Sequence, residues 1–261
     1  MKKFQNITNK IAPVVSLGIL FLIWLFVGEE KLVPSYMLPS PIDVAKVFVT
    51  DFSILLRHLL ITVQEAAYGL LLGIALAFIT ATVMDRFAFV KKALYPILVI
   101  TQTIPTIALA PLLVLWMGYD MAPKIALVTI TTFFPIAINL LDGFSGADED
   151  AICLMKAMGA TRRQIFFHLK LPSSIGNFFA GLRVSASYAL VGALIAEWLG
   201  GTAGIGVYMT RVKKAYAFDK MFAVILLIIV LSLVLVFVVQ LLQKAAMPWT
   251  HTDKKQKKLG E

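Results

Sequence analysis

Several apolar runs of about 20 residues constrain the fold of this chain more than any other feature of its sequence. The mean hydropathy is +0.86, and only 15% of the residues are charged. An α-helix needs about 20 apolar residues to cross a bilayer, where every backbone N–H and C=O must be satisfied internally. Continuous runs favour helices over the ten-residue alternation of a membrane barrel. The sequence therefore predicts an all-α integral membrane protein and excludes a soluble fold.

We predict six transmembrane helices. They cover about residues 11–28, 58–84, 94–118, 124–144, 175–199 and 221–245. The even number places both termini on one side of the membrane, and the loops on that side carry the larger share of Lys and Arg. Since basic loops stay in the cytoplasm, we expect an N-in/C-in topology. This rule does not explain the basic segment 211–220, which is expected outside.

The predicted spans divide the chain into three parts. Residues 1–57 hold the first span and an outer interfacial helix, residues 58–245 form a core of five spans with a cytoplasmic loop at 145–172, and residues 246–261 form a basic cytoplasmic tail. Ser40 and Pro41 are typical of a helix N-cap and first position, so we expect the interfacial helix from Ile42 to about Leu55, with a plain linker as the alternative. The first apolar run exceeds a signal-peptide core and lacks a small-residue cleavage site, which favours an uncleaved span.

Several chemistries are disfavoured by the residues present. The net charge of +9 does not indicate nucleic-acid binding, because the basic residues gather in loops and tails. The single cysteine, Cys153, cannot form an intramolecular disulfide, and no Cys/His cluster indicates a metal. The three histidines are scattered, and the sequence contains no GxxxxGK[ST] phosphate loop. We therefore expect no enzyme activity, no metal and no cofactor.

The loop 145–172 carries strong helix signals. An acidic stretch that begins at Asp148 suits the N-terminal end of a short helix, and Gly159 suits a left-handed stop position. Thr161 and Gln164 have the spacing of a capping box, which begins a second helix that we expect to end at Pro172.

The two short helices predict a rigid knob with an apolar tip. The tip would consist of Met155, Met158, Ile165 and Phe166. Such a tip suits the groove of a partner protein, but the knob could equally pack on the ends of its own spans.

The loop resembles a known family pattern. Gly159, nine residues and then Leu169-Lys170-Leu171-Pro172 are similar to the cytoplasmic EAA loop of ABC-importer permeases, although residues 153–155 depart from the EAA triplet itself. The stretches 37–44, 102–119, 133–143 and 191–209 resemble the permease group for sulfonates, taurine, nitrate and thiamine precursors. Within that group, the stretch AEWLG at 196–200 is most similar to permeases for thiamine-pyrimidine precursors or riboflavin.

This resemblance implies a type I ABC importer permease (MetI-like) fold in the bacterial cell membrane. It also implies three partners, namely a second copy of the permease, a cytoplasmic ATP-binding cassette ATPase that docks on the loop and uses the ATP, and an extracellular solute-binding protein. The residues that it assigns to ATPase coupling are Met155, Lys156, Gly159, Ala160, Thr161, Arg162, Leu169, Leu171 and Pro172.

Polar side chains within apolar spans are candidates for the transport pathway, because they are costly unless they face protein or a water-filled cavity. The candidates are Gln102, Thr103, Thr106, Asn139 and Glu197. Gln102 ranks first, since it adjoins a proline kink at Pro105 and its amide can donate and accept hydrogen bonds. Glu197 could instead be an interfacial anchor or gate. Glu65 is expected to pair with a cation such as Arg183.

Two classes of transporter fit these features. One is an ABC-importer permease without catalysis of its own, and the other is a secondary transporter or channel that works without an ATPase. Neighbouring genes and the ATP dependence of transport would distinguish the two classes. A membrane-embedded enzyme is disfavoured, because no cluster of catalytic groups is present.

Overall fold

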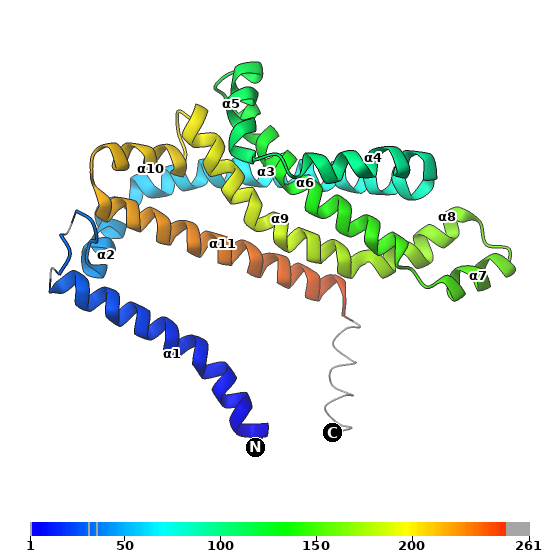
Figure 1. Cartoon of the computed structure of the whole chain (residues 1–261), viewed down its shortest axis with the longest axis horizontal. Helices are drawn as coiled ribbons and strands as arrows, with labels where there is room; N and C mark the ends of the chain where they lie inside the picture. The colour runs from blue at the N-terminus through cyan, green and yellow to red at the C-terminus, as the bar shows by residue number, and fades with distance from the viewer. Residues whose placement is uncertain (1, 31, 35, 249–261) are drawn as a thin grey trace. The chain divides into compact units, whose positions relative to one another are not determined.

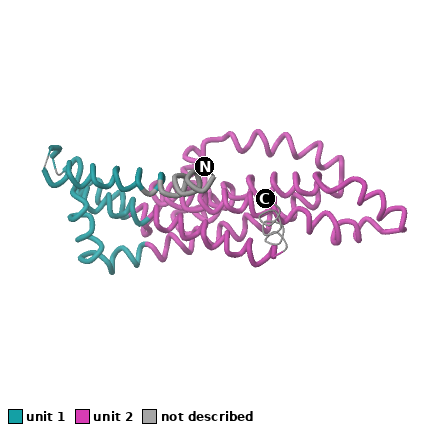
Figure 2. The backbone as a smooth tube through the Cα atoms, turned by 90° about the horizontal axis from the view of Figure 1, so that it is seen from below, with its two compact units in different colours: residues 1–58, 208–227 teal, residues 59–207, 228–261 magenta. Residues whose placement is uncertain are grey.

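A computed structural model describes residues 2–30, 32–34 and 36–248, and its regular structure in these ranges is helical (Figure 1). The helices are α1 (Lys2–Glu29), α2 (Pro41–Thr50), α3 (Phe52–Arg86), α4 (Ala88–Thr101), α5 (Thr106–Met117), α6 (Met121–Ser145), α7 (Glu149–Ala157), α8 (Arg162–Ile165), a π-helical turn η1 (Phe166–Lys170), α9 (Leu171–Gly200), α10 (Ile205–Lys214) and α11 (Phe218–Ala246). The chain divides into two compact units (Figure 2), residues 1–58 with 208–227 and residues 59–207 with 228–261.

Fewer helices than predicted meet the length and composition of a membrane span. Within the described residues, four qualify, namely α3, α6, the continuous helix Arg162–Gly200 and α11. A fifth arises if α4 and α5 count as one span, although they are bent by 101° at the break between them. The apolar part of the first helix, Val15–Glu29, is shorter than a usual span. The all-α membrane fold is confirmed, whereas the prediction of six spans is not.

The first unit contains a helix, α2, in the region where an interfacial helix is predicted. Ser40 caps α2 by accepting a hydrogen bond from the Asp43 backbone N–H, and Pro41 takes the first helical position. The helix ends at Thr50, so the predicted extension to Leu55 was wrong. The reason is a turn at Asp51, after which α3 begins at Phe52.

Asp51 ties this turn to two later helices of the same unit. Its carboxylate accepts a hydrogen bond from the Tyr208 hydroxyl at 3.0 Å and forms an ion pair with Lys220 Nζ at 2.6 Å. The hydrogen bond from Lys220 lowers the pKa of Asp51, while burial raises the pKa of the Tyr208 hydroxyl. One of the basic residues of the segment 211–220 therefore serves as an internal ion-pair partner.

The second unit has its core among α3, α6 and α9. Leu140 and Phe144 of α6 pack with Ala77 of α3 and with Leu182 and Ala186 of α9, and all five are buried. Small side chains at such positions allow membrane helices to approach closely. This packing holds the three helices in place, and the polar sites described below are built on them.

The predicted knob keeps its first helix but not the predicted end of its second. The second helix continues through η1 into α9, so the prediction that Pro172 ends it was wrong. Proline is tolerated because it lies in the first turn of α9, directly after a π-helical turn, where the regular α-helical hydrogen-bond ladder is already interrupted. The knob is thus a direct extension of a membrane-spanning helix.

Candidate functional site

The break between α4 and α5 opens a cavity of about 260 Å³. Pro105 lacks a backbone N–H, and residues 102–105 are not helical, so the two helices separate at this point. The cavity wall contains the side chains of Gln102, Thr106, Thr131 and Tyr188, together with apolar groups such as Phe134. None of its lining residues is charged. The arrangement is suited to a small neutral ligand with hydrogen-bonding and aromatic character.

The structure brings together only part of the predicted pathway set. Gln102 and Thr106 line the cavity. Thr103 donates its hydroxyl to the Ile100 carbonyl at 2.7 Å and is not among the lining residues. Asn139 donates its side-chain amide to the Pro135 carbonyl at 2.8 Å, within its own helix. Sequence reasoning missed Thr131 and Tyr188, because they come from α6 and α9 and only the tertiary fold places them beside the break.

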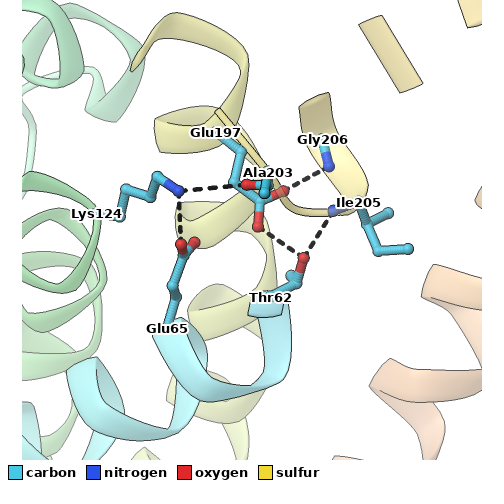
Figure 3. A network of polar contacts seen from close by, with 7 residues as sticks. All are labelled: Thr62, Glu65, Lys124, Glu197, Ala203, Ile205 and Gly206. Carbon is cyan, nitrogen blue, oxygen red and sulfur yellow. Dashed lines mark hydrogen bonds and ion pairs between the residues drawn. The ribbon is translucent and has the colours of Figure 1, made fainter. Parts of the chain in front are cut away.

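The fifth pathway candidate, Glu197, belongs to a buried polar network (Figure 3). Its carboxylate accepts a hydrogen bond from the Thr62 hydroxyl at 2.6 Å and another from the Gly206 backbone N–H. The same hydroxyl accepts from the Ile205 backbone N–H at 2.8 Å. The first backbone N–H groups of α10 lack partners within that helix, and Thr62 and Glu197 supply them. Glu197 therefore joins α3, α9 and α10.

Glu65 and Lys124 form the other half of this network. Lys124 Nζ lies 2.6 Å from the Glu65 carboxylate and 3.3 Å from the Ala203 carbonyl oxygen. The exposed fractions of Glu65, Lys124 and Glu197 are 0%, 4% and 1%. Lys124, and not Arg183, is the cation that pairs with Glu65, so the predicted Glu65–Arg183 pair was wrong. Arg183 instead donates to the Phe179 carbonyl of its own helix at 3.4 Å.

A glycine makes room for this network. Gly204 has a φ of +123°, and a Cβ at this position would lie 2.1 Å from a carboxylate oxygen of Glu197. Any side chain here would be strained and would collide with the network. The loop between α9 and α10 is therefore built around the carboxylate.

The knob, which lies beside the C-terminal end of α3, has the local geometry that its sequence predicts. Thr161 and Gln164 form a capping box, and Gly159 adopts a φ of +80°. Asp148 caps α7 through the Asp150 backbone N–H. An ion pair of 2.6 Å between Lys170 and Asp85 fastens the knob to α3.

The apolar tip of the knob differs from the predicted one. Ile165 is only 5% exposed, and Phe166 packs on Phe144 with a ring separation of 5.2 Å, so the prediction that both are exposed was wrong. They are covered because the second helix runs directly into the packed core. Met158 is exposed as predicted, at 79%, and Leu154 and Phe167 are exposed in place of Ile165 and Phe166, at 64% and 61%. The π-helical turn changes the helical phase, which explains why Phe167 was not predicted.

The residues predicted for ATPase coupling lie along this knob and in the first turn of α9, which follows it. Lys156, Gly159, Thr161, Arg162 and Pro172 are exposed. The half-buried members of the set are Met155, Ala160, Leu169 and Leu171.

Known proteins resemble the chain along most of its length. The family described as "Binding-protein-dependent transport system inner membrane component" matches residues 69–249. The formylaminopyrimidine transport permease protein ThiX of Halalkalibacterium halodurans is 34% identical over 238 residues, covering 91% of this chain and 95% of that protein. A probable ABC transporter permease protein of Haemophilus influenzae is 35% identical over 225 residues, covering 86% of this chain and 92% of that protein.

A solved structure shares the fold. A chain of the MetNI methionine ABC transporter in an inward-facing conformation matches with a TM-score of 0.67 at 18% identity, covering 75% of this chain and 97% of that chain.

Proposed function

We propose a substrate and a mode of assembly for this chain, which belongs to the family of binding-protein-dependent transport system inner membrane components. As a member of that family it is a multi-pass permease subunit of a bacterial ABC importer in the inner membrane, and it works in a complex with an ATPase and a binding protein. It lacks an ATPase domain and uses no cofactor, because ATP is hydrolysed by the partner ATPase.

The proposed substrate is a small heterocycle of the thiamine-pyrimidine type. The cavity at the α4–α5 break supports this proposal most strongly, because its wall offers an amide, hydroxyls and aromatic rings but no charged group. An anionic sulfonate, taurine or nitrate would lack a cationic partner there. The volume of about 260 Å³ is below the roughly 300–1,000 Å³ usual for drug-sized ligands, which favours a single ring over riboflavin. The name of the ThiX relative agrees with this preference.

Within the importer, we assign the knob to ATPase docking. The exposed Leu154, Met158 and Phe167 supply apolar contacts, while Lys156 and Arg162 supply charge. Because the second helix is continuous with α9, a push on the knob would reach the core of the second unit without passing through a flexible loop. We propose N-in/C-in topology, which puts the knob in the cytoplasm, and a homodimer as the functional permease pair.

Uptake by proteoliposomes tests the substrate proposal. The permease, its ATPase and its binding protein are reconstituted together, and the uptake of labelled formylaminopyrimidine, riboflavin, taurine and nitrate is compared. We expect ATP-dependent uptake of the formylaminopyrimidine only. Preferential uptake of taurine or nitrate would overturn the neutral-heterocycle proposal while leaving the family assignment intact.

A further inference from the structure

A second cavity, of about 580 Å³, lies between the end of α3 and the knob. Its wall includes the last turn of α3 with Arg86, the end of α7 with Lys156, and Arg162 and Arg163 of α8. We call this cavity the basic cleft. It belongs entirely to the second unit and is separate from the cavity at the α4–α5 break.

The basic cleft carries uncompensated positive charge. Asp85 and Lys170 also line it, but they neutralise each other in their 2.6 Å ion pair. Within the described part of the chain, Arg86, Lys156, Arg162 and Arg163 form no ion pair. Glu149 is at the opposite end of α7 from Lys156, about 10 Å away along the helix axis, so it does not neutralise this cluster. Four cations thus converge on one cavity without an acidic partner.

The cleft also has an apolar wall. Ile165, Phe166 and Phe167 form the apolar part of the wall. A ligand that fits must therefore combine an anionic head with apolar atoms.

The position of the cleft identifies the source of such a ligand. Arg86 is the last residue of the membrane-spanning helix α3, so the cleft lies where a bilayer has its head groups. Basic pockets between membrane helices on the cytoplasmic side are suited to acidic lipid head groups, and the proposed topology puts the cleft on that side. We propose that the basic cleft binds the phosphate head group of an anionic phospholipid such as phosphatidylglycerol.

Such a lipid would affect the coupling between the ATPase and the permease. Lys156 and Arg162 belong to the residues assigned to ATPase docking, and Arg86 and Arg163 do not. A bound phosphate would draw α7 and α8 toward the end of α3 by contacting cations on all three helices. The anionic lipid content of the membrane would then influence how firmly the knob is held, which goes beyond the role of a permease as such.

Lipid retention tests this proposal. The permease is extracted from nanodiscs that contain either phosphatidylglycerol or phosphatidylcholine, and native mass spectrometry counts the bound lipids. The test variant is Arg86→Gln/Arg163→Gln, which removes two cleft cations and spares the docking residues. The control is Lys213→Gln/Lys214→Gln, which removes two exposed cations from α10. We expect wild type and control to retain one phosphatidylglycerol per chain, and the test variant to lose at least tenfold in occupancy.

Several results would overturn it. Equal retention of phosphatidylglycerol by the test variant, or equal retention of phosphatidylcholine by wild type, would rule out recognition of an anionic head group in this cleft. Displacement of the lipid by millimolar inorganic phosphate would make it a site for a soluble anion. Loss of ATPase association by the test variant in lipid-free detergent would assign the cleft to the ATPase interface.

Discussion

The N-terminal half of α3 and its C-terminal end use charged residues in opposite ways. In the N-terminal half, Thr62 and Glu65 contribute to a network with Lys124 and Glu197 in which the charged groups are almost fully buried. About 30 Å along the same helix, Arg86 faces an open cleft with three other cations that have no ion-pair partner within the described residues. Buried charges stabilise only when their partners are in place, whereas open charges remain available to other molecules. The network in the N-terminal half therefore fixes the helices, and the C-terminal end is where partners and lipids can act.

The largest effect should come from breaking the buried network. Lys124→Met removes the only ammonium of the network and leaves the carboxylates of Glu65 and Glu197 buried without it. Removing one partner of a buried ion pair costs about 3–5 kcal/mol. We therefore expect a large drop in the thermal unfolding temperature of the variant in detergent micelles.

The matched control for this prediction is at the open end. Lys156→Met removes an exposed lysine and should change the free energy of unfolding by no more than about 0.5 kcal/mol. If both variants unfold at the same temperature, the contrast between the two ends is wrong.

A smaller effect is expected from the turn of the knob. No atom lies within 4 Å of a Cβ built on Gly159, so a substitution there acts through the φ of +80° alone. Gly159→Val should strain the turn and lower the amount of co-purified ATPase about tenfold, while membrane insertion persists. Gly159→Asn is the control, because asparagine tolerates the left-handed region. Equal ATPase recovery with the two variants would show that the turn geometry does not matter for docking.

The pathway cavity should respond more weakly still. Gln102→Ala removes one hydrogen-bonding group, which is worth about 0.5–1.5 kcal/mol. The half-saturating substrate concentration for uptake should rise about two- to tenfold. Thr103→Ala is the neighbouring control, since the Thr103 hydroxyl donates to the Ile100 carbonyl at the end of α4 and Thr103 does not line the cavity. A larger loss with Thr103→Ala than with Gln102→Ala would remove Gln102 from the pathway.

The smallest effect concerns the partly exposed ion pair of the first unit. Lys220 lowers the pKa of Asp51 below its ordinary value near 3.8. The pair therefore stabilises the folded protein at pH values above 3.8, and this contribution is lost as the pH falls through the lowered pKa. The free energy of unfolding is measured from pH 6 down to the lowest pH at which the protein still folds. It should depend less steeply on pH in Asp51→Asn than in wild type. An unchanged slope would mean that the pair contributes nothing measurable.

Local signals in the sequence predicted local structure well. Ser40, Thr161, Gln164 and Gly159 cap or end helices as expected, because these functions depend on neighbours within a few residues. The membrane class followed from hydropathy, and the break at Pro105 followed from the missing backbone N–H of proline. The bend of 101° could not be predicted, since packing of α5 on α6 and α9 determines it.

The pairing of residues that are far apart in the chain could not be predicted from the sequence. Lys124 is the first residue of the predicted span 124–144, and the structure buries it against Glu65, a residue 59 positions earlier. No local pattern identifies which cation a buried carboxylate will find, and Arg183 was an equally reasonable partner before the helix rotations were known. The basic cleft is a similar case, because its cations come from three separate helices.

The central claim is that this permease moves its substrate only when an ATPase acts on the knob, and energised proteoliposomes test it most directly. Vesicles that contain the permease with its ATPase and binding protein should take up labelled formylaminopyrimidine when ATP is supplied. Vesicles that contain the permease alone should show no uptake under a proton or sodium gradient. Gradient-driven uptake by the permease alone would contradict the account and would instead identify a secondary transporter.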